Sequence, residues 1–227
     1  MVRRRALSGR GERSLSRRRL LVAAGAATAG LSGCLGLGGG PSASGDAVSE
    51  LPPPVRGDPE ADVTVMAFED YACPHCAHYV LNILPDVVSN YAEPGKIRYE
   101  HHDFPIPVDG VESWRAGSAA RAVQDTVGMD AFWEYSHKLY ANQRNLGLDL
   151  YEQLAREVGA EDPGAIRAAA EANRYKPVLE ADRQKGSDMG VGGTPTVFVN
   201  GRAVDPAADG QSGLGYGDIE AAIENAL

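Results

Sequence analysis

The chain has few cysteines and few lysines, and each shortage excludes a class of protein. Three cysteines in 227 residues are too few for a small scaffold that disulfides hold together. Lysine occurs only four times, and the formal net charge is −9, which excludes a protein that binds nucleic acid through a basic surface. A hydrophobic fraction of 43% is enough for a real core, so the chain has room for one domain with a tail or an insertion.

The N-terminus has the pattern of an export signal. Eight arginines lie within the first 19 residues, and an uncharged stretch follows from Leu20 to Leu37. "SRRRLL" (16–21) resembles a twin-arginine signal and "LSGC" (31–34) resembles a lipobox, which would make Cys34 the lipid-modified first residue of the mature chain. Alternatively the stretch stays as an uncleaved anchor, although its many Ala and Gly residues make it weakly hydrophobic. We therefore predict a signal segment over 1–33 and a tether outside the membrane.

The charge of the exported part suggests a saline environment. Without residues 1–33 the chain has 14 basic and 30 acidic residues, a net charge of −16. High salt shortens the Debye length to about 3 Å at 1 M and screens the repulsion within such a surface. We therefore expect a halophilic host and a chain that unfolds in dilute buffer but not in molar salt. Full stability in dilute buffer, measured by circular dichroism, would contradict this hypothesis.

Residues 34–57 are predicted to form a flexible linker. The composition from Gly36 to about Asp62 is dominated by Gly, Pro, Ser and acidic residues, with no apolar period. The folded domain is accordingly expected over 58–227.

A strand, a cysteine turn and a helix follow the linker. Residues 63–69 are apolar and rich in β-branched side chains, as in a buried strand. After the turn, apolar residues recur from Val80 to Tyr91 with the period of one helix face, and Pro85 within this pattern predicts a kink.

The remaining elements suggest a helical insertion between strands. Residues 96–102 read as a second strand, and helical patterns fill about 110–188. Two apolar runs joined by Asn200-Gly201 predict a hairpin, and the C-terminal residues from Tyr216 predict a closing helix.

The cysteine turn reads "CPHC" (73–76), and its position favours redox chemistry. Cys73 is expected at the N-terminus of a helix, where unpaired N–H groups and the helix dipole stabilise a thiolate and lower the pKa of the thiol. Pro74 suits the first helical position, where a missing N–H has no cost. We expect His75 to donate a hydrogen bond or a positive charge to the Cys73 sulfur. Cys76, one turn into the helix, should be more buried and act as the resolving thiol.

Other uses of a C-x-x-C pair fit less well. An inert structural disulfide stays possible. Haem attachment requires a histidine at position 77, where the chain has alanine. Zinc would need two further ligands, and the adjacent His101 and His102 point to opposite faces of a strand. The sequence therefore predicts no metal and no cofactor.

Thr194-Pro195 is the second landmark, because an X-Pro step directly before an apolar strand favours a cis peptide bond. A plain turn is the alternative interpretation.

Together these motifs resemble the DsbA-like branch of the thioredoxin superfamily. The segments "FEDYACPHC", "FWEYSHKLYANQ" and "GVGGTPTVFVNGR" occur in the family's order, from about residue 58 to the C-terminus. The resemblance implies an α/β fold, a thioredoxin fold with an inserted all-helical subdomain.

The resemblance also implies roles for individual residues. Cys73 and Cys76 would be the redox disulfide, Pro74 and His75 the dipeptide that tunes it, and Thr194-Pro195 a cis-proline loop that binds substrate backbone. A buried carboxylate shuttles protons in many relatives. Here Glu69 and Asp70 are the nearby candidates, since Ala67, the inward neighbour on the strand, carries no acid, and we expect Glu69 to take this part.

The function expected from this resemblance is disulfide formation in exported proteins, by exchange through Cys73 and Cys76. The partners would be exported protein thiols and a membrane redox protein, quinone-linked or electron-donating, with the enzyme held at the outer face of the membrane by a lipid on Cys34. A membrane-fed reductase or isomerase is an alternative, as is a non-catalytic chaperone or metallochaperone on the same fold.

Overall fold

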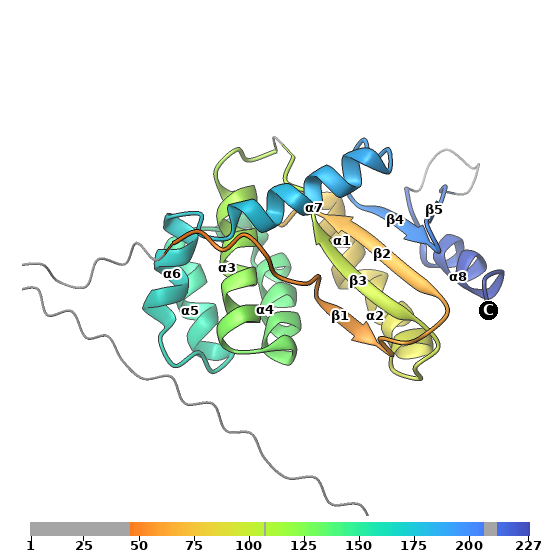
Figure 1. Cartoon of the computed structure of the whole chain (residues 1–227), viewed down its shortest axis with the longest axis horizontal. Coiled ribbons are helices and arrows are strands. Elements are labelled where there is room, and N and C mark those ends of the chain that lie inside the picture. The colour runs from red at the N-terminus through yellow and green to blue at the C-terminus, as the bar shows by residue number, and fades with distance from the viewer. Residues whose placement is uncertain (1–45, 107, 207–212) are drawn as a thin grey trace, which may run out of the picture. The chain divides into compact units, whose positions relative to one another are not determined.

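The structure, a computed structural model, describes residues 46–106, 108–206 and 213–227. At its centre is a five-stranded mixed sheet in the order β1-β3-β2-β4-β5 (Figure 1). The strands are β1 (Val55–Gly57), β2 (Thr64–Glu69), β3 (Arg98–Asp103), β4 (Thr196–Val199) and β5 (Arg202–Ala203). β2 and β3 run parallel, and the other neighbouring strands are antiparallel. The two strands predicted from apolar runs, at 63–69 and 96–102, are therefore adjacent in the sheet.

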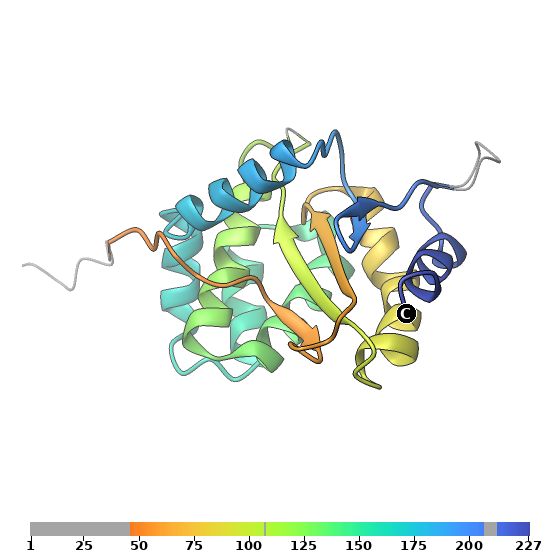
Figure 2. The same ribbon diagram turned by 45° about the vertical axis from the view of Figure 1, so that its right-hand side comes forward.

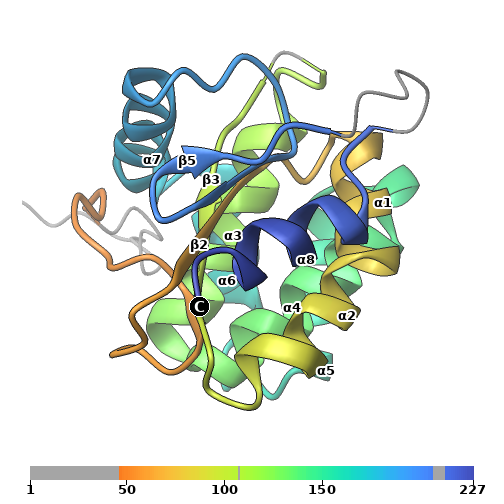
Figure 3. The ribbon, with the colours of Figure 1, turned by 90° about the vertical axis from the view of Figure 1, so that its right-hand side faces the viewer.

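Helix α7 (Lys176–Asp188) covers one face of the sheet, opposite α1 (Pro74–Asn82), α2 (Leu84–Val87) and α8 (Tyr216–Glu224), as Figure 3 shows. A small aromatic cluster built around Phe68, Phe104 and Phe198 lies on the sheet. α7 approaches it closely because residue 186 is glycine: a Cβ there would lie 2.7 Å from the Phe104 ring. The larger core fills the opposite face.

The helix after the cysteine turn is interrupted, as Pro85 predicted. α1 ends at Asn82, α2 begins at Leu84, and a π-helical turn follows over Val88–Ala92. Proline lacks the N–H for an i to i−4 bond and its ring crowds the preceding turn, so the backbone restarts with Pro85 in the first turn of α2.

Five helices occupy the chain between β3 and β4, as the helical patterns predicted (Figure 2). They are α3 (Glu112–Thr126), α4 (Met129–Ala141), α5 (Leu148–Glu157), α6 (Pro163–Glu171) and α7, with a short 3-10 turn at Gln143–Asn145. After them, β4 and β5 form the predicted hairpin, in which Asn200 and Gly201 have positive φ angles of 46° and 77°.

The expected linker over 34–57 ends earlier than predicted. β1 pairs with β3 as an edge strand, and the Pro52 carbonyl accepts hydrogen bonds from Arg121 and Gln124 of α3. Val48 N–H donates to the Arg174 carbonyl. A segment without an apolar period can join a sheet edge through backbone hydrogen bonds, and the sequence pattern does not register those bonds.

The predicted signal segment and Cys34 lie outside the described residues. In the part of the chain that the structure describes, no helix combines the length and the apolar character needed to cross a membrane.

Candidate active site

Cys73 and Cys76 lie at the start of α1, directly after the short turn that follows β2. Cys73 is the N-cap residue, Pro74 is the first helical residue, and Cys76 follows one turn later. Both cysteines are free thiols. Cys73 is 3% exposed and Cys76 fully buried, while Pro74 and His75 are exposed. Only Cys73 therefore borders the surface on which a substrate could bind.

The pKa of the Cys73 thiol is lowered to about 5. The largest cause is a hydrogen bond with the Cys76 thiol, and burial opposes it. The Thr194 side chain and the backbone N–H groups of Cys76 and His75 lower the pKa further. The helix N-terminus thus contributes as expected, although the second thiol contributes more. His75 contributes to this lowering through its backbone N–H.

The pKa of the Cys76 thiol moves in the opposite direction. Burial raises it well above its usual value, and the neighbouring Cys73 and the charge of Glu69 add to the effect. At neutral pH the reduced pair is therefore one thiolate, on Cys73, beside one thiol, on Cys76.

The loop before β4 lies directly against Cys73. The Thr194–Pro195 peptide bond is cis, as predicted. The Cys73 thiol donates to the Thr194 carbonyl oxygen at 3.3 Å. The Thr194 hydroxyl is buried without a hydrogen-bond partner, and Thr194 is one of the residues that lower the pKa of Cys73. Beside this loop, a hollow extends past His75 and His78 toward Leu214.

Glu69 is 2% exposed at the end of β2, behind the cysteines. Tyr99 and Tyr140 each donate a hydroxyl hydrogen bond of 3.0 Å to it, one to each carboxylate oxygen. His101 Nδ1 lies 3.5 Å from Glu69 Oε1. These three partners were missed by sequence reasoning. His101 stands opposite Ala67 in the β2–β3 register, a pairing that only the folded sheet reveals.

Asp70, the other candidate carboxylate, serves a different part of the site. It accepts hydrogen bonds from the Ala72 and Ile106 N–H groups and from the Ser113 hydroxyl. Its pKa is raised to about 6, mainly by burial, with a contribution from Cys73. Asp70 therefore ties the cysteine turn to the loop after β3 and to the start of α3.

The two adjacent histidines of β3 face opposite sides, as predicted. His101 packs near Phe132 and Trp133, and His102 stacks on Phe68 and contacts Asp182. Among the described residues no three His, Cys, Asp or Glu side chains lie where they could share a metal ion.

Two thiols of such unequal acidity, one helical turn apart and held under a cis-proline loop, define a thiol:disulfide oxidoreductase with a thioredoxin-type site. A family model described as thioredoxin matches residues 49–214. The chain belongs to this thioredoxin family, and within it to the DsbA-like thiol:disulfide oxidoreductases.

Individual relatives agree with this assignment. Disulfide bond formation protein D of Bacillus subtilis is 27% identical over 191 residues, which cover 80% of this chain and 82% of that protein. The crystal structure of oxidised BdbD from Bacillus subtilis matches with a TM-score of 0.68 at 26% identity, over 80% of this chain and 98% of that one. A thioredoxin-like oxidoreductase from Silicibacter pomeroyi matches with a TM-score of 0.62 at 25% identity, over 77% and 91%. The expected fold, a thioredoxin fold with a helical insertion, is thereby confirmed.

Proposed function

We propose that this enzyme oxidises the thiols of exported proteins to disulfides through Cys73 and Cys76. The observation that supports oxidation of the substrate, and not its reduction, is the Cys73 pKa of about 5. At neutral pH the reduced enzyme holds Cys73 as a thiolate, and whatever stabilises the reduced form makes the disulfide a stronger oxidant.

The exchange proceeds in two balanced steps. A substrate thiolate attacks Cys73 Sγ, the Cys73–Cys76 bond breaks, and Cys76 leaves with the electron pair and takes up a proton. The second substrate thiolate then attacks the substrate sulfur of the mixed disulfide, and Cys73 leaves as a thiolate. The substrate has lost two electrons to the enzyme. The unequal acidity of the two thiols supports this assignment, since the group that leaves in the second step is the better leaving group.

Four further residues complete the proposed site. Pro74 and His75 separate the thiols and present the helix N-terminus to Cys73. Thr194 and Pro195 form the loop on which substrate backbone would bind, a role supported by the contact of the Thr194 carbonyl with Cys73. Glu69 would relay the proton of Cys76, because its charge acts on that thiol from within the protein.

We place the enzyme outside the cell membrane, held there by a lipid on Cys34. The arginine-rich signal and the "LSGC" motif support this location. Reoxidation then requires an electron acceptor, either a quinone-linked membrane protein or an extracellular oxidant. A membrane protein that donates electrons would instead make the enzyme a reductase or an isomerase.

The direct test is a pH titration of thiolate absorbance in the reduced chain. The full chain would carry Cys34→Ser, so that only the two active-site thiols contribute. Absorbance should be present above pH 5 and lost as the pH falls through about 5, because the lowered pKa belongs to Cys73. A midpoint near the ordinary value of about 8.5 would remove the basis for an oxidase.

A reduction potential measured against glutathione separates oxidase from reductase. A value near about −120 mV supports oxidation of substrates, and one near about −270 mV supports their reduction.

A further inference from the structure

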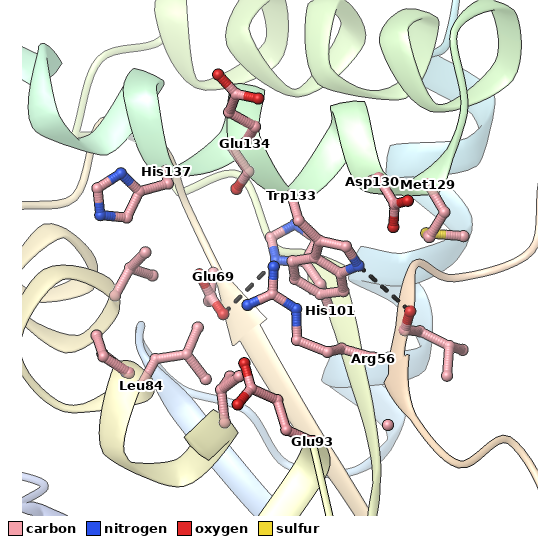
Figure 4. Close-up of a pocket in the computed structure, with 16 residues that line it drawn as sticks. Arg56, Glu69, Leu84, Glu93, His101, Met129, Asp130, Trp133, Glu134 and His137 are labelled. Atoms are coloured by element: carbon pink, nitrogen blue, oxygen red, sulfur yellow. Dashed lines mark hydrogen bonds and ion pairs between the residues drawn. The ribbon is translucent and has the colours of Figure 1, made fainter. Parts of the chain in front are cut away.

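The end of helix α4 lies against the cysteine turn, and the rest of the helix is held in place along the sheet layer. Near its start, Trp133 borders a cavity of about 740 Å³ (Figure 4) and donates its indole N–H to the Val55 carbonyl. Near its end, the Tyr140 hydroxyl donates to Glu69, and the Tyr140 ring stacks on Tyr71 with the ring centroids 4.8 Å apart. The residues directly after α4 are therefore carried to the turn by a helix that is fixed at both ends.

Gln143, two residues after the end of α4, reaches the turn itself. Its side-chain amide donates to two backbone carbonyls, that of Tyr71 at 2.7 Å and that of Cys73 at 2.8 Å. Both partners are acceptors, so only the amide nitrogen, which has two N–H groups, satisfies them. Gln143 is half-buried and lies 70 residues beyond Cys73 in the chain. Nothing in the sequence around the cysteines therefore indicates this contact.

The cysteine turn is held from two sides. The Asp70 carboxylate accepts the Ala72 N–H at 2.8 Å, and the Asp70 carbonyl accepts the Cys73 N–H at 3.0 Å. Gln143 binds the carbonyl groups of the turn instead. The Cys73 carbonyl also accepts the first hydrogen bond of α1, from the Ala77 N–H at 3.1 Å. Gln143 therefore acts on the residue at which the turn ends and the helix begins.

This attachment bears on the acidity of Cys73, because the groups that lower its pKa must keep their places around the sulfur. The backbone N–H groups of Cys76 and His75 lower the pKa, and hydrogen bonds weaken steeply when distance and angle change. A Cys73 backbone that could rotate would carry the sulfur away from these groups and from the Thr194 carbonyl, which lies 3.3 Å from it. A donor on the Cys73 carbonyl also offsets the negative end of that dipole beside the sulfur, which favours the thiolate.

We propose that Gln143 is a positioning residue for the exchange reaction, because its amide fixes the Cys73 backbone and so keeps the Cys73 sulfur at the N-terminus of α1. The inference rests on the proposed function. Gln143 acts through the Tyr71 and Cys73 carbonyls and not on a reacting sulfur. Cys76 and Asp70 are the titratable groups that face Cys73, and both stay in place when the uncharged Gln143 is replaced. A change in the acidity of Cys73 then reports on the position of its backbone.

The test is a pH titration of thiolate absorbance in the full chain carrying Cys34→Ser, with and without Gln143→Met. Methionine has nearly the length of glutamine but no N–H group to donate. The midpoint is expected at about 5 with Gln143 in place. It should rise by about one pH unit in Gln143→Met, since two ordinary hydrogen bonds are lost. The equilibrium constant for reduction of the disulfide by glutathione at pH 7 should accordingly fall about tenfold, because a less acidic Cys73 stabilises the reduced form less.

Two further variants separate hydrogen bonding from packing and from general effects of substitution. Gln143→Glu keeps the size of the side chain, but its carboxylate at pH 7 has no N–H group and would face two carbonyl oxygens. It should lower the equilibrium constant with glutathione at least as much as Gln143→Met. Gln153→Met is the matched control, because the Gln153 amide donates to Glu157 on the exposed surface of α5. It should change neither the midpoint nor the equilibrium constant.

An unmoved midpoint in a folded Gln143→Met chain would overturn the inference, and lower stability to urea beside it would mean that Gln143 is structural only. An equilibrium constant left unchanged by Gln143→Glu would overturn it as well, because packing alone would then suffice. If Gln143→Met does not fold, Gln143→Asn replaces it. Its amide is one methylene too short to reach both carbonyls, so the midpoint should again rise, and an unmoved midpoint would again contradict the inference.

Failure of the proposed function would look different. The midpoint would then lie near the ordinary value of about 8.5 even with Gln143 in place. A midpoint of about 5 that no substitution of Gln143 moves would leave the proposed function intact and remove only the role of Gln143.

Discussion

Cys76→Ser, in a chain that also carries Cys34→Ser, should stop turnover and keep a mixed disulfide on Cys73 when oxidised glutathione is supplied. Cys73 keeps most of its environment in this variant, including the Thr194 contact and the backbone N–H groups of α1. It loses the hydrogen bond that contributes most to its low pKa, so its pKa should also rise. When oxidised glutathione is supplied, the Cys73 thiolate attacks it, one glutathione leaves as a thiolate, and the other stays bonded to Cys73 because no Cys76 thiol can expel it. Oxidation of a reduced test protein should therefore fall to the uncatalysed rate, and mass spectrometry should show one glutathione adduct per chain.

Cys73→Ser in the same Cys34→Ser chain is the companion variant and should form no adduct, because the fully buried Cys76 cannot meet glutathione. Cys34→Ser is the matched control and should oxidise the test protein at the unaltered rate. If Cys76→Ser turned over normally, the pair would not act as a resolving couple. A chaperone or metallochaperone would instead bind its clients or copper equally well after Cys73→Ser.

Arg121→Met should lower the free energy of unfolding by about 3–5 kcal/mol, the usual effect of removing one partner of a buried ion pair. Arg121 is fully buried in α3, and its guanidinium contacts Asp103 at 2.6 Å and Asp182 at 2.5 Å. Burial alone would raise the pKa of Asp103, but Arg121 and His101 hold it well below its usual range. Without the arginine, two carboxylates stay in the interior with too little positive charge. Urea unfolding at neutral pH measures the change.

Arg156→Met is the matched control for this prediction. Arg156 is paired with Glu152 on the surface of α5, and its side chain is 64% exposed. Exposed pairs contribute little to stability, so its unfolding midpoint should not change measurably. Equal destabilisation by the two substitutions would mean that the buried network does not hold β3, α3 and α7 together.

Much of the fold could be predicted because the sequence signals that determine it act locally. The period of the apolar residues, Pro85, and the Asn200-Gly201 turn each act on the few residues around them, and their predicted effects agree with the structure. β1 was missed for the opposite reason. Its three residues join the sheet only through a partner strand more than forty residues away, and no periodicity records such a pairing.

In the candidate site, too, some features follow from local sequence and others depend on tertiary contacts. The C-x-x-C spacing and the following helix place Cys73 at a helix N-terminus, so a lowered pKa could be predicted. The largest cause of that lowered pKa, the Cys76 hydrogen bond, depends on atomic positions. The surroundings of Glu69 depend on the register of β2 against β3 and on the packing of α4.

The sequence by itself determined the chemistry that is available: two thiols one turn apart, a proline before an apolar strand, and a carboxylate beside them. These features follow from residue order and from short-range backbone preferences. Only the tertiary structure decided how strongly each group is perturbed, because burial, hydrogen bonds and charge pairs between β3, α3 and α4 join residues far apart in the chain. The unequal acidity of Cys73 and Cys76 arises from those contacts.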